Sequence, residues 1–266
     1  MTIKSPVVCV ILFVFLFGYG TIFSQEAREV RKTVELNKDG EVYIDTYKGS
    51  ITIDTWDKPE VEIYAKIEPD GWDRHSREKV RNTEIRIDDS PNRVRIKSDY
   101  EEVHSHSSWF FGLFDDNSGS LPFVYYTITM PSTAHLRIKD YKSESKISDL
   151  ASSVNMETYK GRVDFKNLNG SVDLETYKGE VHVEFTKMRD DSRFETYKGN
   201  ISITMPKNAG FALDADIGRH ADLHSDFDIS VRSRHRDEER YHTSMNGGGP
   251  LLRISTEKGD IRLKAR

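Results

Sequence analysis

The segments SVNMETYKG (153–161), RVDFKNLNG (162–170) and SVDLETYKG (171–179) repeat one pattern three times in succession. Gly161, Gly170 and Gly179 fall nine residues apart, and each unit carries two apolar residues separated by one other residue. Such alternation predicts a short strand with one buried face, and the glycine predicts a turn. Because the word ETYKG returns in every second unit, two strands and two turns together make one coil of about 18 residues.

Variants of the same word occur far outside this stretch. They are DTYKG (45–49), DYKS (140–143), ETYKG (195–199) and STEKG (255–259). Repeats whose strands stack on the next repeat are typical of solenoid proteins. We therefore predict an all-β, β-helix-like solenoid of short strand repeats that forms a single domain over residues 25–266.

Residues 1–24 have the composition of a secretory signal peptide. Lys4 precedes an apolar run of eleven residues (7–17), and small residues follow before residue 25. The run is shorter than the roughly 20 residues that span a bilayer, which favours a cleaved signal over an anchor helix. We expect export to the periplasm or the cell surface. Cys9 is the only cysteine and lies in this segment, so the folded domain cannot rely on disulfides.

The charge distribution limits the classes of partner. The formal net charge is −5, and acidic and basic residues are interspersed along the chain. This is not the basic footprint of a nucleic-acid-binding protein. A composition of 31% charged and 36% hydrophobic residues is typical of a thin β structure with a large solvated surface.

The two ends of the chain keep the alternation but lose the period. Residues 27–68 contain four alternating segments, which we expect to be the first coils. Residues 73–82 predict a short surface helix, and 84–98 predict two strands around a polar turn at Pro91. Beyond residue 205 we expect irregular terminal coils, followed by a last repeat that contains STEKG (255–259).

The segment 100–121 is an insert with an aromatic tip, formed by Trp109, Phe110, Phe111 and Phe114. Solenoids need caps on their terminal cores, so this tip could cover one end of the stack. The alternative is an exposed tip that contacts a ligand or a membrane. An exposed patch of large apolar side chains is a liability in a soluble protein, which favours the cap.

The sequence shows no recognisable catalytic or cofactor motif. His220 and His224 would present ligands together only on a helix, which Gly218 and the nearby Asp and Ser residues disfavour, so we predict no metal site. There is no nucleophile elbow, phosphate loop or HExxH motif. We expect neither cofactor nor enzymatic activity. A polysaccharide-acting β-helix enzyme with acids on neighbouring coils stays the competing class.

Stacking of the coils at about 4.8 Å would align the repeated residues in rows. The predicted rows are Glu157, Glu175 and Glu195; Tyr159, Tyr177 and Tyr197; and Lys160, Lys178 and Lys198. We expect the acid row and the lysine row to neutralise each other. Strict alternation would place the tyrosines outside, but the matching place in the intervening unit holds Leu168. This favours tyrosines that fill a corner of the core over an exposed binding strip.

Several composite segments resemble a known family. They are GSITIDTWDKPEVEI (49–63), MPSTAHLRIKDYKSESKI (130–147), AGFALDADIG (209–218) and NGGGPLLRISTEKGDIRL (246–263). Together with the ETYKG repeats, they are similar to the bacterial putative-adhesin family of β-strand-repeat proteins, a domain of unknown function. The resemblance covers about residues 30–264 and supplies no catalytic residues. This chain departs from it in the Tyr-Lys before each glycine and in the aromatic insert.

These observations together predict an exported, non-enzymatic scaffold or adhesin-like protein of the bacterial envelope. Its partner would be an unidentified envelope protein or glycan, with no nucleic acid and with membrane contact by residues 109–114 not favoured. The alternatives are a polysaccharide-binding or polysaccharide-cleaving β-helix protein, or a periplasmic partner of an envelope-signalling system. The candidate interaction surface comprises Trp109, Phe110, Phe111, Phe114, Tyr159, Tyr177 and Tyr197.

Overall fold

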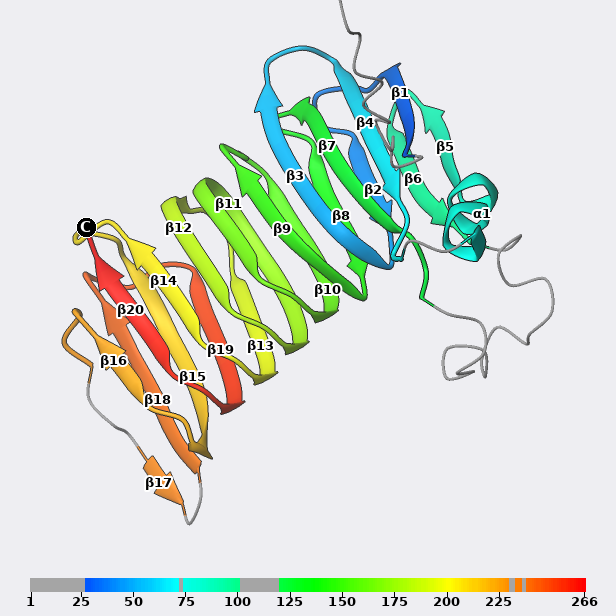
Figure 1. Cartoon of the computed structure of the whole chain (residues 1–266). Coiled ribbons are helices and arrows are strands. Elements are labelled where there is room, and N and C mark those ends of the chain that lie inside the picture. The colour runs from blue at the N-terminus through cyan, green and yellow to red at the C-terminus, as the bar shows by residue number, and fades with distance from the viewer. Residues whose placement is uncertain (1–26, 72–73, 101–119, 230–232, 236–237) are drawn as a thin grey trace, which may run out of the picture.

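The computed structural model describes residues 27–71, 74–100, 120–229, 233–235 and 238–266. These residues are almost entirely β structure, which confirms the predicted all-β class (Figure 1). The elements are β1 (Arg28–Glu35), β2 (Glu41–Asp45), β3 (Lys48–Trp56), β4 (Glu60–Glu68), α1 (Arg74–Asn82), β5 (Glu84–Ser90), β6 (Arg93–Asp99), β7 (Phe123–Pro131), β8 (His135–Asp140), β9 (Lys142–Ser148), β10 (Ser153–Lys160), β11 (Val163–Lys178), β12 (Val181–Met188), β13 (Ser192–Lys198), β14 (Ile201–Met205), β15 (Phe211–His220), β16 (Leu223–Ser225), β17 (Ser233–His235), β18 (Glu238–Met245), β19 (Leu251–Lys258) and β20 (Ile261–Ala265).

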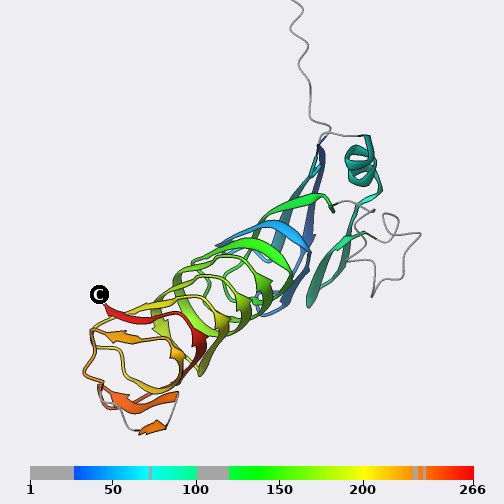
Figure 2. The same ribbon diagram turned by 60° about the horizontal axis from the view of Figure 1, so that its bottom comes forward.

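Two sets of paired strands run along the molecule, and the chain winds from one to the other (Figure 2). In sheet A the order is β1-β4-β7-β3-β9-β11-β12-β14-β20-β16. In sheet B it is β5-β6-β2-β8-β10-β11-β13-β19-β15-β18-β17. Strand β11 contributes to both sheets. Apolar residues from both sheets form one continuous core between them.

The 18-residue period holds in the middle of the stack. Val154 pairs in parallel with Val172 in sheet B, and Val163 pairs with Val181 in sheet A. Val154, Val163 and Val172 share one buried core, as the nine-residue spacing requires. On the next coil the offset grows to 20 residues, where the backbone amide of Val172 donates to Ser192 Oγ. The period thus describes the central coils and not the whole chain.

The turn glycines are required by close contact between coils. A Cβ atom built on Gly161 would lie 1.9 Å from the carbonyl oxygen of Ser143, and its φ of 153° is a conformation that other residues rarely adopt. Gly170 and Gly179 would meet the carbonyl oxygens of Ser152 and Gly161 in the same way. The glycine repeat therefore marks the corners where the backbones stack.

The N-terminal end corrects the prediction that the four alternating segments of residues 27–68 are the first coils. Only β2 and β3 form a parallel coil, against β8 and β9. Strands β1 and β4 are antiparallel to each other, and β4 is antiparallel to β7. After β3 the chain reverses at 57–59 and stays in sheet A, so it cannot complete a second coil. The predicted pair around Pro91 is confirmed as the antiparallel strands β5 and β6.

Helix α1 confirms the expected helix but is not confined to the surface. Val80 is 2% exposed and belongs to the common core, and Ser76 is also buried. The helix therefore helps to cover the N-terminal end of the stack (Figure 1).

The C-terminal end also differs from expectation. Strands β19 and β20, which carry the last repeat, pack directly on β13 and β14. The irregular strands β15 and β16 then lie outside them, and β18 pairs antiparallel with β15. The last repeat in sequence is therefore inside the stack, because the chain leaves at residue 205 and returns to fill the position next to β13.

Two predicted segments fall outside the described residues. These are residues 1–26, with the predicted signal peptide, and residues 101–119, with Trp109, Phe110, Phe111 and Phe114. In the part of the chain that the structure describes, no helix is long and apolar enough to cross a membrane.

Candidate ligand-binding groove

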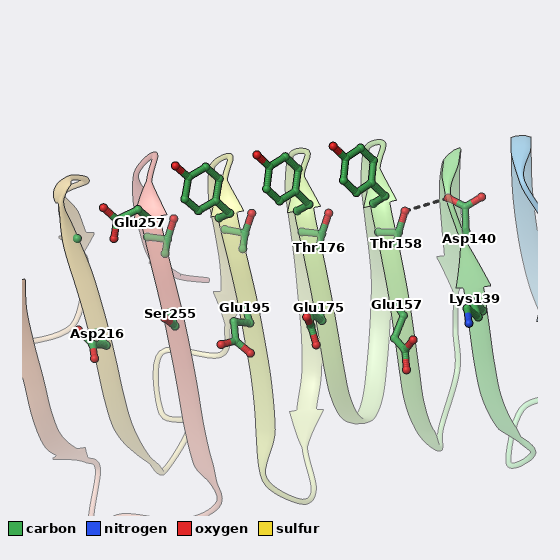
Figure 3. Close-up of a pocket in the computed structure, with 16 residues that line it drawn as sticks. Lys139, Asp140, Glu157, Thr158, Glu175, Thr176, Glu195, Asp216, Ser255 and Glu257 are labelled. Carbon is green, nitrogen blue, oxygen red and sulfur yellow. Dashed lines mark hydrogen bonds between the residues drawn. The ribbon is translucent and has the colours of Figure 1, made fainter. Parts of the chain in front are cut away.

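A groove of about 610 Å³ crosses sheet B along the direction in which the coils stack (Figure 3). It is built from β8, β10, β11, β13, β19 and β15, which pair in parallel in that order. Strands β10, β11 and β13 each contribute the Glu, Thr and Tyr of the repeated word. The lining residues are Lys139, Asp140, Glu157, Thr158, Tyr159, Glu175, Thr176, Tyr177, Glu195, Thr196, Tyr197, Asp216, Gly218, Ser255, Thr256 and Glu257.

One side of the groove is formed by stacked tyrosine rings. The stack has five members, which we call the tyrosine ladder: Tyr47, Tyr141, Tyr159, Tyr177 and Tyr197. The last three of them line the groove. Successive ring centroids are 4.7–5.1 Å apart and the ring planes are within 1–7° of parallel. These separations lie in the range of offset stacking. The sequence prediction missed Tyr47 and Tyr141, although the words DTYKG and DYKS were the signal for them.

The three tyrosines that the sequence analysis named are exposed, which corrects the prediction that they fill a corner of the core. Tyr159, Tyr177 and Tyr197 are 43%, 46% and 43% exposed. The comparison with Leu168 was misleading because β11 is irregular just before that residue. Asn167 has a φ of 54°, and the register shifts between Phe165 and Leu168, which turns the leucine inward. In the strands that carry the tyrosines the alternation continues undisturbed as far as the tyrosine.

The stacking decides which part of each tyrosine a ligand can reach. Tyr141, Tyr159 and Tyr177 each have a neighbouring ring on both faces. At one end Tyr100 packs edge-on against Tyr47, and at the other Lys258 Nζ lies 5.3 Å from the centroid of Tyr197. The ladder therefore offers ring edges and one phenol hydroxyl per coil, and no broad aromatic face.

A row of acidic residues runs beside the ladder. We call Glu157, Glu175 and Glu195 the acid row; they are directly paired in register on β10, β11 and β13. The row continues to Lys139 at one end and, through Ser255, to Asp216 at the other. Figure 3 shows these side chains below the tyrosines on successive strands.

The expected neutralisation of the acid row by lysines is wrong. Among the described residues no ion pair joins it to Lys160, Lys178 or Lys198. Glu195 is paired with Arg193 of the same strand. Glutamate and tyrosine are two residues apart and share a face of the strand, whereas each lysine comes one residue later, at the corner. The lysines are exposed and do not line the groove.

On each of these strands a buried threonine lies between the glutamate and the tyrosine in sequence. Some of the threonine hydroxyls have a hydrogen-bond partner and others have none among the described residues. Thr158 Oγ1 donates to Asp140 Oδ2 at 2.9 Å. Asp140 also accepts from the backbone amide and the hydroxyl of Ser143, at 2.8 and 2.6 Å. Burial raises the pKa of the Asp140 carboxyl, and these hydrogen bonds oppose that shift. Thr176 and Thr196 are 3% and 4% exposed, and neither hydroxyl has a hydrogen-bond partner among the described residues.

A separate cluster contains possible metal ligands. Ligand atoms of Asp222, His224 and Asp260 lie within 4.8 Å of one another. His220, the predicted neighbour of His224, is not in the cluster. Asp222 and His224 are exposed, and Asp260 already accepts a hydrogen bond from Arg262 at 2.9 Å. Exposed acidic groups are common without a metal, so we assign no metal to this cluster.

The chain is similar, at low sequence identity, to the following solved structures. A putative cell adhesion protein from Clostridium sporogenes is 13% identical, with a TM-score of 0.45, and the match covers 90% of this chain and all of that one. A putative adhesin from Bacteroides fragilis is 13% identical, with a TM-score of 0.38 and coverage of 89% and 97%. A putative lipid binding protein from Parabacteroides distasonis is 10% identical, with a TM-score of 0.33 and coverage of 89% and 97%.

No curated protein matches the chain. The Toastrack DUF4097 family model matches residues 132–264, which is half of the sequence and includes every strand that lines the groove. This match confirms the family resemblance seen in the repeats, although over a shorter range than residues 30–264. The chain belongs to the Toastrack DUF4097 family.

Proposed function

We propose that this chain is an exported, non-enzymatic binding protein of the bacterial envelope, and that its groove binds an extended polymer along the stacking direction. The observation that carries the proposal is the repetition of the same two side chains, Glu and Tyr, on one face of three neighbouring strands of the groove. A site that repeats at a constant step fits a ligand that also repeats. Export is supported by the composition of residues 1–24.

The groove lies on the face of a rigid scaffold. Its strands pair in parallel from β8 to β15, and the residues beneath them belong to the common core. Binding along such a face requires little ordering of the protein, so little binding free energy is lost to conformational entropy. This favours attachment to a surface polymer over a partner that must be wrapped by a mobile segment.

The proposal is tested by sedimentation of the purified domain with insoluble cell-envelope polysaccharide. We expect the double variant Tyr159→Ala/Tyr177→Ala to bind at least about fivefold more weakly, because it removes two adjacent hydroxyls and two rings from the groove. Tyr64→Ala on β4 of sheet A is the matched control, because Tyr64 lies outside the groove. Equal binding by all three proteins would refute a role for the groove.

A second candidate, a polysaccharide-cleaving enzyme, is favoured by the convergence of acids from successive coils. Glu175 has Glu157 and Glu195 directly beside it on the neighbouring strands, and paired carboxylates are the groups that glycosidases use. Our proposal predicts no release of reducing ends during long incubation with soluble polysaccharides. Release that disappears in Glu175→Gln, but persists in Glu144→Gln on β9, would establish the enzyme instead.

A further inference from the structure

We propose that the polymer bound in the groove is a linear glycan that carries amino groups, with about one sugar residue per coil. This inference rests on the proposed function and specifies the chemistry of its ligand. Three features of the groove lead to it: the charge of the acid row, the way the tyrosines are presented, and the spacing of the repeats.

The charge of the groove favours a cationic ligand. Glu157 and Glu175 are exposed, and neither makes an ion pair or a hydrogen bond with another described residue. Their direct register places like charges side by side, which destabilises a sheet. Lys139 is the one cation in the lining, against Asp140, Asp216, Glu257 and the acid row. Ammonium groups of a ligand would relieve this repulsion, whereas carboxylates of a polyuronate would increase it.

The polar groups favour a ligand with many hydrogen-bonding groups. Each tyrosine presents a hydroxyl, which can donate and accept, while its ring faces are covered by neighbouring rings. The threonines add nothing to this set, because Thr176 and Thr196 alternate with the glutamates and tyrosines and their hydroxyls are buried. Sugars supply hydroxyl and amino groups on every unit.

The spacing distinguishes a glycan from a peptide. Neighbouring strands of a sheet lie about 4.8 Å apart, and the tyrosine rings follow that step. This is close to the length of one pyranose residue in an extended 1,4-linked chain. An extended peptide rises about 3.3 Å per residue, so side chains on one face recur at about 6.6 Å and lose register with the coils after a few steps. A 1,4-linked glycan therefore keeps register with the coils, whereas a peptide does not. Because successive residues of a β-1,4-linked chain are turned by about half a turn, its amino groups fall beside every second glutamate.

The test is isothermal titration calorimetry of the purified domain with three hexasaccharides. These are β-1,4-linked glucosamine, with its amines protonated, its fully N-acetylated form, and a galacturonic acid hexamer. We expect the amino form to bind tightest and the uronate weakest. Added salt should weaken the amino form most, because exposed charges are screened. The double variant Glu157→Gln/Glu175→Gln should weaken the amino form about threefold to tenfold, the change expected for loss of one exposed ion pair and of the charge beside it.

Two controls separate the groove from general attraction between a cation and an acidic protein. Glu144→Gln removes the same charge from β9 in sheet A and should change the affinity by less than about twofold. Tyr177→Phe keeps the acid row and removes one hydroxyl, so it should weaken the amino and acetylated forms to a similar extent. An equal loss in Glu144→Gln and in the groove variants would overturn the inference.

The remaining outcomes separate this inference from the proposed function. If the acetylated or uronate hexamer binds tightest and Tyr177→Phe weakens it, the groove binds a polymer but the inference of an amino glycan is wrong. The same holds if an extended lysine-containing peptide binds in the groove and no hexasaccharide does. If neither the sugars nor envelope polysaccharide bind in a groove-dependent way, the proposed function is refuted as well.

Discussion

At the scale of the residue, the tyrosine ladder contributes to stability as well as to the groove. Tyr177 stacks on Tyr159 at 4.8 Å and on Tyr197 at 5.1 Å, so its removal breaks two aromatic contacts. Each contact is worth about 0.5–1.5 kcal/mol beyond its buried area. We expect Tyr177→Ala to lower the free energy of unfolding in urea by about 1–3 kcal/mol.

The matched variant Tyr177→Phe keeps both stacking contacts and should change the same free energy by less than about 0.5 kcal/mol. The pair therefore separates the structural role of the ring from the binding role of the hydroxyl. If Tyr177→Ala unfolds at the same urea concentration as the wild type, stacking in this ladder contributes nothing measurable.

Asp140 predicts a specific dependence of stability on pH. Burial raises the pKa of its carboxyl above the ordinary value of 3.8, so the folded protein binds the proton more tightly than the unfolded chain does. This contribution is fully present below pH 3.8 and is lost as the pH rises through the raised pKa. The loss should be visible as a decrease in the free energy of unfolding over that range.

The variant Asp140→Asn should remove this decrease. An asparagine oxygen can accept from the Ser143 amide and from Thr158, and its amide group can donate to the Ser143 hydroxyl. At neutral pH we expect it to be at least as stable as the wild type, measured by urea unfolding across the pH series. A neutral-pH loss of more than about 1 kcal/mol would show that the charged carboxylate is the better acceptor here.

At the scale of the element, the sequence predicted what depends on local alternation and missed what depends on contacts between distant strands. The nine-residue glycine spacing was sufficient for β10, β11 and β12, because each strand and turn is specified within one unit. The nine-residue period does not reveal the backbone irregularity at Asn167, which turns Leu168 inward. The comparison with Leu168 therefore led to the wrong prediction that the tyrosines are buried. The groove itself could have been anticipated by assuming strict alternation throughout.

The order of strands at the two ends could not be predicted from the repeat pattern. The position of β19 beside β13 is fixed by pairing across 60 residues, such as the hydrogen bond from the Leu251 amide to Asp191. The word STEKG showed that this strand belongs to the repeat, but not which coil it stacks on. Antiparallel pairing of β4 with β7 is likewise set by a reversal at 57–59, which alternation alone does not reveal.

The aromatic insert provides a prediction for an element outside the described residues. If Phe110 and Phe111 belong to a cap, replacing both with Ser should lower stability by several kcal/mol, because each buried phenylalanine contributes about 1.5–3 kcal/mol by transfer alone. If they form a contact surface, the melting temperature should stay nearly unchanged. Thermal unfolding together with tryptophan fluorescence distinguishes the two. An unchanged melt with a water-exposed emission maximum contradicts the cap.

At the scale of the whole molecule, the described coils form a linear stack in which each contacts mainly its neighbours (Figure 2). The stability of such a structure is approximately the sum of the stability of each coil and of the interfaces between coils. A coil can then be removed while the remaining strands still pair in parallel with their new neighbours, provided that the deletion keeps each strand in its own sheet. The 18-residue offset between Val154 and Val172 defines the length of that unit.

Deletion of residues 162–179 removes one complete coil and joins Gly161 to Glu180. Gly161 then takes the place of Gly179, so a turn glycine still precedes β12 and β10 can pair with β13. We expect a folded β protein with cooperative urea unfolding and a lower free energy of unfolding, since one coil and one interface are lost. Its groove is shorter by one Glu-Tyr pair, so the affinity for a long polymer should fall while the affinity for a short oligomer changes less.

Deletion of the nine residues 162–170 is the matched control, because it removes one strand and one turn and leaves half a coil. The segment SVDLETYKG would then follow Gly161 directly and would have to occupy sheet A instead of sheet B. Every later strand would change sheets, and the tyrosine ladder would be interrupted after Tyr159. Circular dichroism and urea unfolding should show a folded protein for the 18-residue deletion and loss of cooperative structure for the nine-residue deletion. Equal behaviour of the two would mean that the two-strand coil is not the unit from which this molecule is built.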